Sequence, residues 1–120
     1  MKKILYIEDE VDQNMMMETR LSSAGYECVT ANDGEEGYRM ACEEKPDLII
    51  LDIIMPKMNG YEVSYSLKNN EKTRDIPIMI VTASGAKVME EKCLALGVKE
   101  VIHKPYNSVY LLKQIARYIK

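Results

Sequence analysis

Acidic, hydroxyl and lysine side chains follow the short apolar segments of this sequence, and together they could handle a phosphoryl group. They are Glu8 and Asp9, Asp52, Thr82 and Lys104. A carboxylate can attack phosphorus as a nucleophile, while a lysine and a hydroxyl stabilise the charge on the transferred oxygens. Crowded carboxylates raise one another's pKa values, and a hard cation such as magnesium removes that conflict. These residue types therefore indicate magnesium-assisted phosphoryl transfer to a carboxylate.

The acidic turn after the first apolar segment argues against the common nucleotide cofactors. A nucleotide-binding turn is rich in glycine and offers backbone N–H groups to phosphate. Here the turn is Glu8-Asp9-Glu10, whose charges would repel phosphate and flavin alike. The chain also has neither a Walker-type lysine motif nor Gly-x-Gly-x-x-Gly. We therefore expect no dinucleotide, flavin or nucleoside triphosphate cofactor.

Short strand-like segments alternate with longer helical ones, and this alternation must position the reactive side chains. The strand-like segments are 4–7, 27–31, 48–51, 78–81 and 101–102, and the helical ones are 11–24, 35–44, 61–68, 87–96 and the stretch after Pro105. In the last helix, Leu112, Ile115, Ala116 and Ile119 have the spacing of one buried face. Right-handed β-α units predict an α/β fold with a doubly wound, five-stranded parallel sheet. Such sheets bind ligands at the carboxyl ends of their strands, where the reactive residues fall.

Composition excludes several classes of function. A chain of 120 residues, 47% of them hydrophobic, predicts one domain that spans 1–120. The net charge of −3 argues against binding nucleic acid through phosphate neutralisation. Three scattered cysteines and a single histidine argue against a zinc site or a disulfide framework. No apolar run is long enough to cross a membrane or to act as a signal peptide, so we expect a soluble, cytoplasmic protein that binds no membrane.

From Ile4 to Ile119, the chain resembles the response-regulator receiver domain of two-component signalling. The resemblance rests on Glu8-Asp9, Asp52-Ile53-Ile54-Met55-Pro56-Lys57-Met58-Asn59-Gly60, Thr82-Ala83 and Lys104-Pro105. Each motif alone is weak, but all four in this order, each at the end of a strand-like segment, are highly specific. The resemblance implies a flavodoxin-like (βα)5 fold with strand order 2-1-3-4-5.

The resemblance also implies a set of ligands for Mg²⁺. Asp9 and Asp52 would bind the metal directly, and the backbone carbonyl of Ile54 would be the third protein ligand. Glu8 would act through a bound water. Asp52 would then accept a phosphoryl group from a phosphohistidine on a sensor histidine kinase or a histidine phosphotransfer protein.

The remaining motif residues would recognise the phosphoryl group. Lys104 would pair first with Asp52 and then with a phosphoryl oxygen. Thr82 would turn inward to hydrogen-bond the phosphoryl group, and the backbone N–H of Ala83 would assist. The family usually has a cis peptide at the position of Lys104–Pro105, which would point the lysine into the site.

Phosphorylation in this family changes the affinity of a face built from the fourth helix, fifth strand and fifth helix for a downstream protein. Val101 stands where the family usually has the aromatic residue that moves together with the threonine. Asn59 replaces a common Asp, and Tyr106 replaces a commoner Phe. The helical pattern runs to the end of the sequence, so we expect output through another protein and no direct contact with nucleic acid. We also expect no turnover of an external substrate.

Two other classes of protein remain as alternatives. Phosphatases of the haloacid-dehalogenase type also use an Asp nucleophile, magnesium and a lysine, but they need a second acid two residues after the nucleophile. Ile54 occupies that position here. A receiver-like binding module without phosphoryl chemistry is the other alternative. The presence of Asp52, Thr82 and Lys104 argues against it, and Val101 argues slightly for it.

Overall fold

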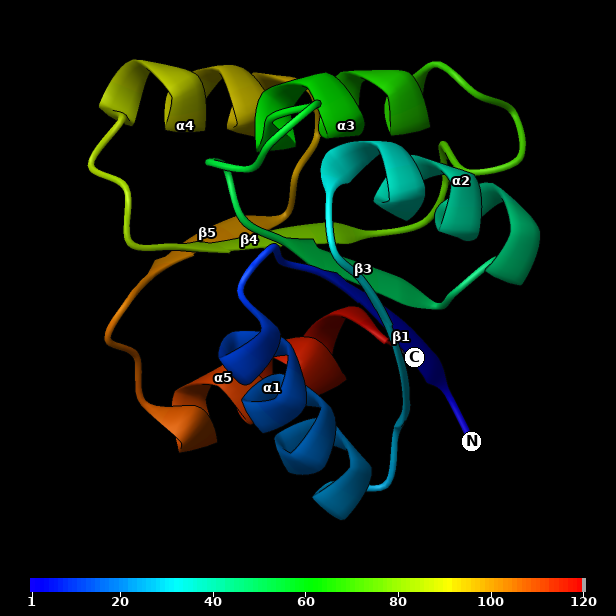
Figure 1. Cartoon of the computed structure of the whole chain (residues 1–120), viewed down its shortest axis with the longest axis vertical. Helices are drawn as coiled ribbons and strands as arrows, with labels where there is room; N and C mark the ends of the chain where they lie inside the picture. The colour runs from blue at the N-terminus through cyan, green and yellow to red at the C-terminus, as the bar shows by residue number, and fades with distance from the viewer. Residues whose placement is uncertain (120) are drawn as a thin grey trace.

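The computed structural model describes residues 1–119, and its strands form one parallel sheet (Figure 1). The strands are β1 (Lys3–Ile7), β2 (Glu27–Ala31), β3 (Leu48–Leu51), β4 (Ile78–Thr82) and β5 (Glu100–His103). The helices are α1 (Val11–Ser23), α2 (Gly34–Glu44), α3 (Gly60–Lys68), α4 (Lys87–Ala95) and α5 (Ser108–Tyr118). The strand order β2-β1-β3-β4-β5 confirms the predicted fold class and topology. Lys120, the last residue of the predicted domain, lies outside the described residues.

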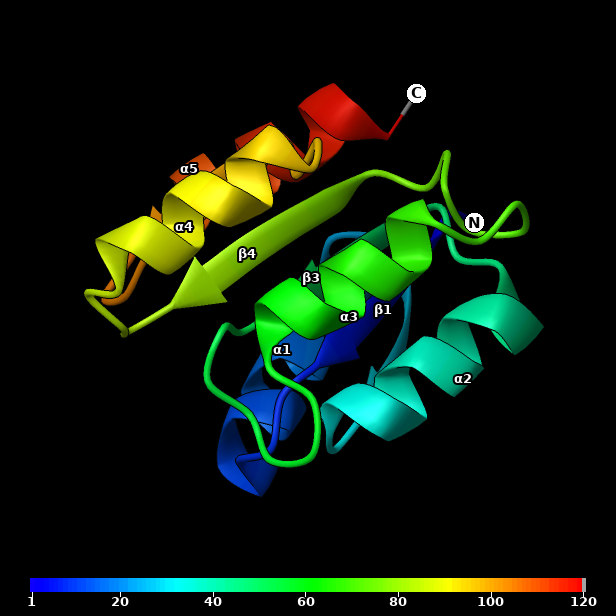
Figure 2. The same ribbon diagram turned by 90° about the horizontal axis from the view of Figure 1, so that it is seen from above.

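Helices cover both faces of the sheet, as Figure 1 shows: α1 and α5 pack on one face, and α2, α3 and α4 on the other. Figure 2 shows from above that α3 lies between α2 and α4. Successive side chains of a strand point to opposite faces. In β1, Leu5 and Ile7 therefore belong to the core beneath α2–α4, whereas Ile4 and Tyr6 belong to the core beneath α1 and α5. All four residues of β3 are fully buried, which explains its uninterrupted apolar sequence.

The buried face of α5 differs from the predicted one. Ala116 is exposed and Leu112 is only half-buried, whereas the buried residues of this helix are Leu111, Gln114 and Ile115. The most buried face is rotated by about one residue, or about 100° around the helix, although Ile115 belongs to the core and Leu112 and Ile119 pack against it as predicted. Gln114 can be buried because its amide donates to the Glu100 carboxylate on β5. The sequence pattern passed over Gln114 because it counted only apolar residues as inward-facing, and it took Leu112 instead of its neighbour Leu111 as the buried leucine.

A capping box fixes the start of α3, the helix that follows the Asp52 loop. The Asn59 side chain accepts a hydrogen bond from the Glu62 backbone N–H at 2.8 Å, and the Glu62 carboxylate accepts one from the Asn59 N–H at 2.9 Å. Each bond satisfies a backbone donor that would otherwise have no partner at the helix end. No helix among residues 1–119 is long and apolar enough to span a membrane.

Replacing Asn59 tests this capping box. Asn59→Ala removes the acceptor for a free N–H group, so we expect the free energy of unfolding to fall by about 1 kcal/mol. Asn59→Asp keeps the acceptor, so we expect a change of less than about 0.5 kcal/mol. Urea denaturation measures both values. An alanine variant as stable as the aspartate variant would contradict a capping role for Asn59.

Candidate functional site

The register of the parallel sheet brings the predicted site residues to one edge. Ile7 of β1 pairs with Leu51 of β3, so Glu8 and Asp52 leave neighbouring strands at the same level. Thr82 pairs with His103 at the ends of β4 and β5, and the Lys104 N–H donates to the Thr82 carbonyl at 2.9 Å. The structure therefore gathers the acids, the hydroxyl and the lysine at the carboxyl ends of the strands.

The two carboxylate oxygens of Asp52 have different partners. Its Oδ1 accepts a hydrogen bond of 2.6 Å from the Thr82 hydroxyl and a longer one of 3.3 Å from the Ile54 N–H. Its Oδ2 lies 3.6 Å from the Lys104 ammonium, and the Asp52 side chain is only 12% exposed. Among the described residues, no hydrogen bond reaches Oδ2. This oxygen is therefore the better placed of the two to form a new bond.

The Lys104 ammonium makes its hydrogen bonds with residues other than Asp52. Its ammonium donates to Glu8 Oε1 at 3.1 Å and to the Gln13 side-chain oxygen. Thus the ion pair that the sequence predicts with Asp52 exists, but it is the looser of the contacts that Lys104 makes. Sequence reasoning missed Gln13 because a polar residue in the first turn of a helix carries no specific signal. The Lys104–Pro105 peptide is cis, as predicted.

Glu8 is almost completely buried, and it is held from several sides. Its Oε1 accepts a hydrogen bond of 3.3 Å from the Tyr6 hydroxyl, and its Oε2 accepts one of 3.3 Å from the Glu10 N–H. Burial raises the pKa of the Glu8 carboxyl, and the neighbouring Lys104 opposes that shift. Burial also raises the pKa of Tyr6 far above its usual range, so its hydroxyl stays a donor. Tyr6 is a second contact of the site that sequence reasoning missed, because within an apolar strand a tyrosine is expected only to fill the core.

A cleft of about 440 Å³ opens at this edge of the sheet. Its walls are Glu8, Asp9, Glu10, Asp52, Ile54, Thr82, Ala83 and Ser84. Within residues 1–119, no cluster of three or more acidic, His or Cys side chains forms a metal-binding group. Magnesium, however, needs only one or two carboxylates when it keeps several waters. The exposed Asp9 carboxylate has no hydrogen bond or ion pair to the described residues, so the donor set fits such an ion.

Val101 occupies the position at which the family's aromatic residue was expected. It is half-buried and packs against the core beneath α2–α4. His103, one residue before Lys104, points outward and contacts Glu90 at 2.9 Å. The Thr82 hydroxyl, which donates to Asp52, also accepts a hydrogen bond of 3.1 Å from the Ser84 N–H. Thr82 therefore links Asp52 to the loop before α4 without help from an aromatic side chain.

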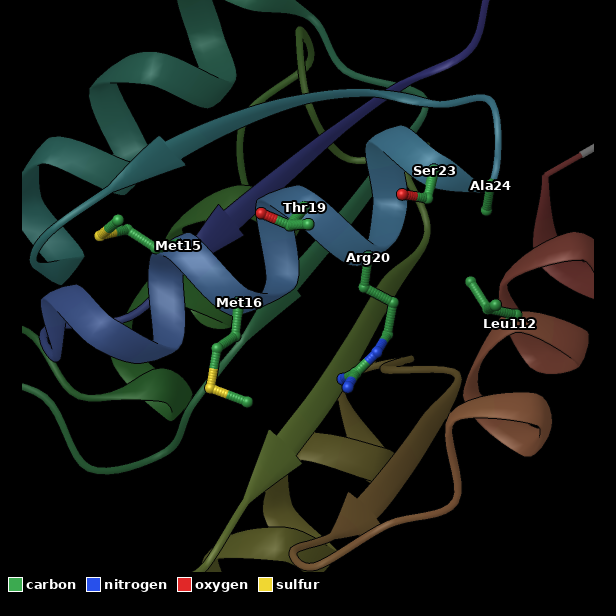
Figure 3. Close-up of a pocket in the computed structure, with 7 residues that line it drawn as sticks. All are labelled: Met15, Met16, Thr19, Arg20, Ser23, Ala24 and Leu112. Carbon is green, nitrogen blue, oxygen red and sulfur yellow. The ribbon is translucent and has the colours of Figure 1, made fainter.

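A larger groove, of about 580 Å³, lies between α1 and α5 and contains none of the predicted site residues (Figure 3). Arg20 and Met16 extend from α1, and Leu112 faces them from α5. Of the methionine triplet, Met15 and Met16 are exposed and Met17 is in the core. The groove is lined mostly by apolar atoms, so phosphoryl chemistry is not expected there.

Comparison with known proteins identifies the family of this chain. A family model for the response regulator receiver domain matches residues 4–116. A probable transcriptional regulator, ycf27 of Cyanophora paradoxa, is 43% identical over 106 residues, which are 88% of this chain but only 43% of the regulator. The chain thus spans about half or less of the length of these curated relatives, such as ycf27 and the regulator PhoB of Pseudomonas aeruginosa.

Solved structures of similar size have the same fold. The chemotaxis response regulator CheY4 of Vibrio cholerae superposes with a TM-score of 0.89 and 31% identity, covering 98% of both chains. The receiver domain of the sensor histidine kinase PA1611 from Pseudomonas aeruginosa PAO1 also has a TM-score of 0.89, with 29% identity over 98% of this chain and 97% of that one. That structure has a magnesium ion coordinated in its active site cleft.

Gly60 tests how closely α3 must approach the site. A Cβ atom there would lie 2.5 Å from the Asp52 carbonyl oxygen and 2.8 Å from the Ile53 Cα, so backbone would have to move. We expect Gly60→Ala to lower the free energy of unfolding by about 1–3 kcal/mol in urea denaturation. Gly85→Ala is the matched control, because no atom lies within 4 Å of its added Cβ. Equal stabilities of the two variants would contradict this close packing.

Proposed function

Because the chain belongs to the response regulator receiver domain family, we propose that Asp52 accepts a phosphoryl group from a phosphohistidine. The donor would be a sensor histidine kinase or a histidine phosphotransfer protein. An Asp52 oxygen forms a bond to phosphorus while the N–P bond breaks, and the electron pair of that bond returns to the imidazole nitrogen. The observation that carries the proposal is the convergence of Thr82 and Lys104 on the two oxygens of Asp52.

The neighbouring groups are suited to hold the transferred group. The Lys104 ammonium beside Oδ2 would pair with one phosphoryl oxygen, and the Thr82 hydroxyl would move from Oδ1 to another. The backbone N–H of Ala83, at the wall of the cleft, would donate to the same group. No general base is needed, because an ionised carboxylate is already a nucleophile.

Asp9 and Asp52 would hold Mg²⁺ directly together with the Ile54 carbonyl, and Glu8 would hold it through a water. When bound, the ion neutralises the crowded carboxylates and the charge on the phosphoryl oxygens. The free Asp9 carboxylate at the cleft supports this assignment. The binding of Glu8 to Lys104 supports an indirect contact, because that carboxylate already has a cation as its partner.

Phosphorylation would then act as a switch. It adds roughly 1.5–2 negative charges and strong acceptor oxygens at Asp52. Thr82 would follow these oxygens and draw the loop before α4 with it, because its hydroxyl accepts from the Ser84 N–H. The face formed by α4, β5 and α5 would change its affinity for a downstream protein. This route uses the Thr82 link and does not require an aromatic residue at Val101.

We also propose that residues 1–120 act as one receiver domain in the cytoplasm, without turnover of an external substrate. Free cysteines at Cys28, Cys42 and Cys93 are typical of a reducing compartment. The apolar Ile54, 62% exposed at the position where a phosphatase of the haloacid-dehalogenase type needs an acid, argues against such an enzyme. Receiver domains are signalling domains, which agrees with that view.

The acceptor is tested by incubating the protein with acetyl phosphate and Mg²⁺ and measuring its intact mass. We expect one phosphoryl adduct, labile at alkaline pH, that disappears when EDTA is added beforehand. Asp52→Asn should abolish it, while Asp12→Asn, an exposed acid on α1, should retain it. An adduct that survives Asp52→Asn, or none in the wild type, would contradict the proposal. Turnover of many phosphate esters would favour the phosphatase.

The switch is tested by following backbone amide resonances during phosphorylation. In the wild type we expect shifts at the site and across α4, β5 and α5. Thr82→Ala should still form the adduct but should lose most of the shifts on that face, because the hydroxyl link to Ser84 is absent. Thr82→Ser keeps the hydroxyl and serves as the matched control. Unchanged shifts on the face in Thr82→Ala would show that Thr82 is not the coupling residue.

A further inference from the structure

The Lys104 ammonium is held by two acceptors other than Asp52. An ammonium has three N–H donors. Two of them are used by Glu8 Oε1 and by the Gln13 side-chain oxygen. The third has no hydrogen-bond acceptor among the described residues, since Asp52 Oδ2, at 3.6 Å, lies beyond the usual range of about 2.7–3.2 Å. The ammonium is therefore near its counter-charge without bonding to it.

We propose that Gln13 is a positioning residue that restrains Lys104 from closing onto Asp52 before phosphorylation. The inference rests on the proposed role of Asp52 as phosphoryl acceptor. The restraint leaves Oδ2 without a hydrogen bond that the attack on phosphorus would have to break. It also keeps the third N–H of Lys104 free for the incoming phosphoryl oxygen. Such preorganisation lowers the cost of the reaction because the donor is in place before charge develops.

Both acceptors that hold Lys104 are themselves fixed. Gln13 lies in the first turn of α1 and is half-buried, so its reach is set by a helix packed on the sheet. Glu8 is buried and receives the Tyr6 hydroxyl on the same oxygen that receives Lys104. A functional side chain supported by such rigid elements stays within a narrow range of positions. Glu8 supplies the opposite charge, and Gln13 supplies a second, neutral acceptor apart from Asp52.

Packing alone does not hold Lys104 in this position. A cavity of about 290 Å³ lies beside it, lined by Gln13 and Lys104 together with Tyr6, Met16, Met17, Arg20, Pro105 and Tyr106. This free volume would let the ammonium and the amide turn without displacing the core. The hydrogen bonds to Glu8 and Gln13 therefore decide where the ammonium lies. Without the one to Gln13, attraction to the carboxylate of Asp52 would draw Lys104 into hydrogen-bond range.

The test compares rates of adduct formation with acetyl phosphate at saturating Mg²⁺. Gln13→Met has a similar shape but no acceptor oxygen, and we expect it to slow the formation of the Asp52 adduct about 3- to 10-fold. Gln13→Glu keeps an acceptor at the same reach and should restore the rate to within about twofold of the wild type. Asp12→Met places the same side chain at an exposed position of the same helical turn and should leave the rate unchanged.

A second measurement separates positioning from a structural effect. In a crystal structure of unphosphorylated Gln13→Met, the distance from Lys104 Nζ to Asp52 Oδ2 should fall from 3.6 Å into hydrogen-bond range. The Mg²⁺ affinity should stay unchanged, because Gln13 lies outside the proposed metal ligands. A rate equal to that of Asp12→Met, or an unchanged distance, would overturn the inference and leave the proposed function intact. A wild type that forms no adduct at Asp52 would overturn both.

Discussion

The gathering of carboxyl groups at the carboxyl ends of a parallel sheet is the constraint on which this candidate site depends. Glu8, Asp9 and Asp52 follow neighbouring strands, and the positive charge that meets them there is Lys104. One lysine is too few to pair with all three carboxyl groups. Glu8 is matched by Lys104, and Asp52 accepts a hydrogen bond from the Thr82 hydroxyl, but Asp9 has no partner among the described residues. This arrangement agrees with the proposed binding of a divalent cation, and then of a phosphoryl group, at the site.

The fold supplies this edge by ordinary packing. Strands that are apolar on both faces must lie between two helical layers, and right-handed crossovers then place their carboxyl ends together. Gly60 lets α3 start against the backbone of the Asp52 loop, and the Asn59 capping box fixes that start. The core therefore holds the site rigid from below. The loop above it contains Ala83 and Ser84, which line the cleft.

Strand ends and helix stops at Gly and Pro were sufficient to predict a parallel α/β sheet with the acids, the hydroxyl and the lysine at its carboxyl ends, while the strand order came from the resemblance to the family. Side-chain contacts were harder to predict. Gln13 and Tyr6 were missed because their roles depend on Lys104 and Glu8, which are brought to them only by the folded chain. Gln114 of α5 was missed for the same reason, since it is buried by its bond to Glu100 on another element. Local patterns report burial of apolar groups but not the partners of polar ones.

A titration of the isotope-labelled protein with Mg²⁺, followed by backbone amide resonances, tests the central claim most directly. The account predicts saturable shifts that are largest around Asp9, Asp52 and Ile54 and that are strongly weakened in Asp9→Asn. The neighbouring Ala83 should follow because it shares the cleft. Shifts centred elsewhere on the surface, or a titration that Asp9→Asn leaves unchanged, would contradict the view that unbalanced carboxylates at this edge recruit the ion.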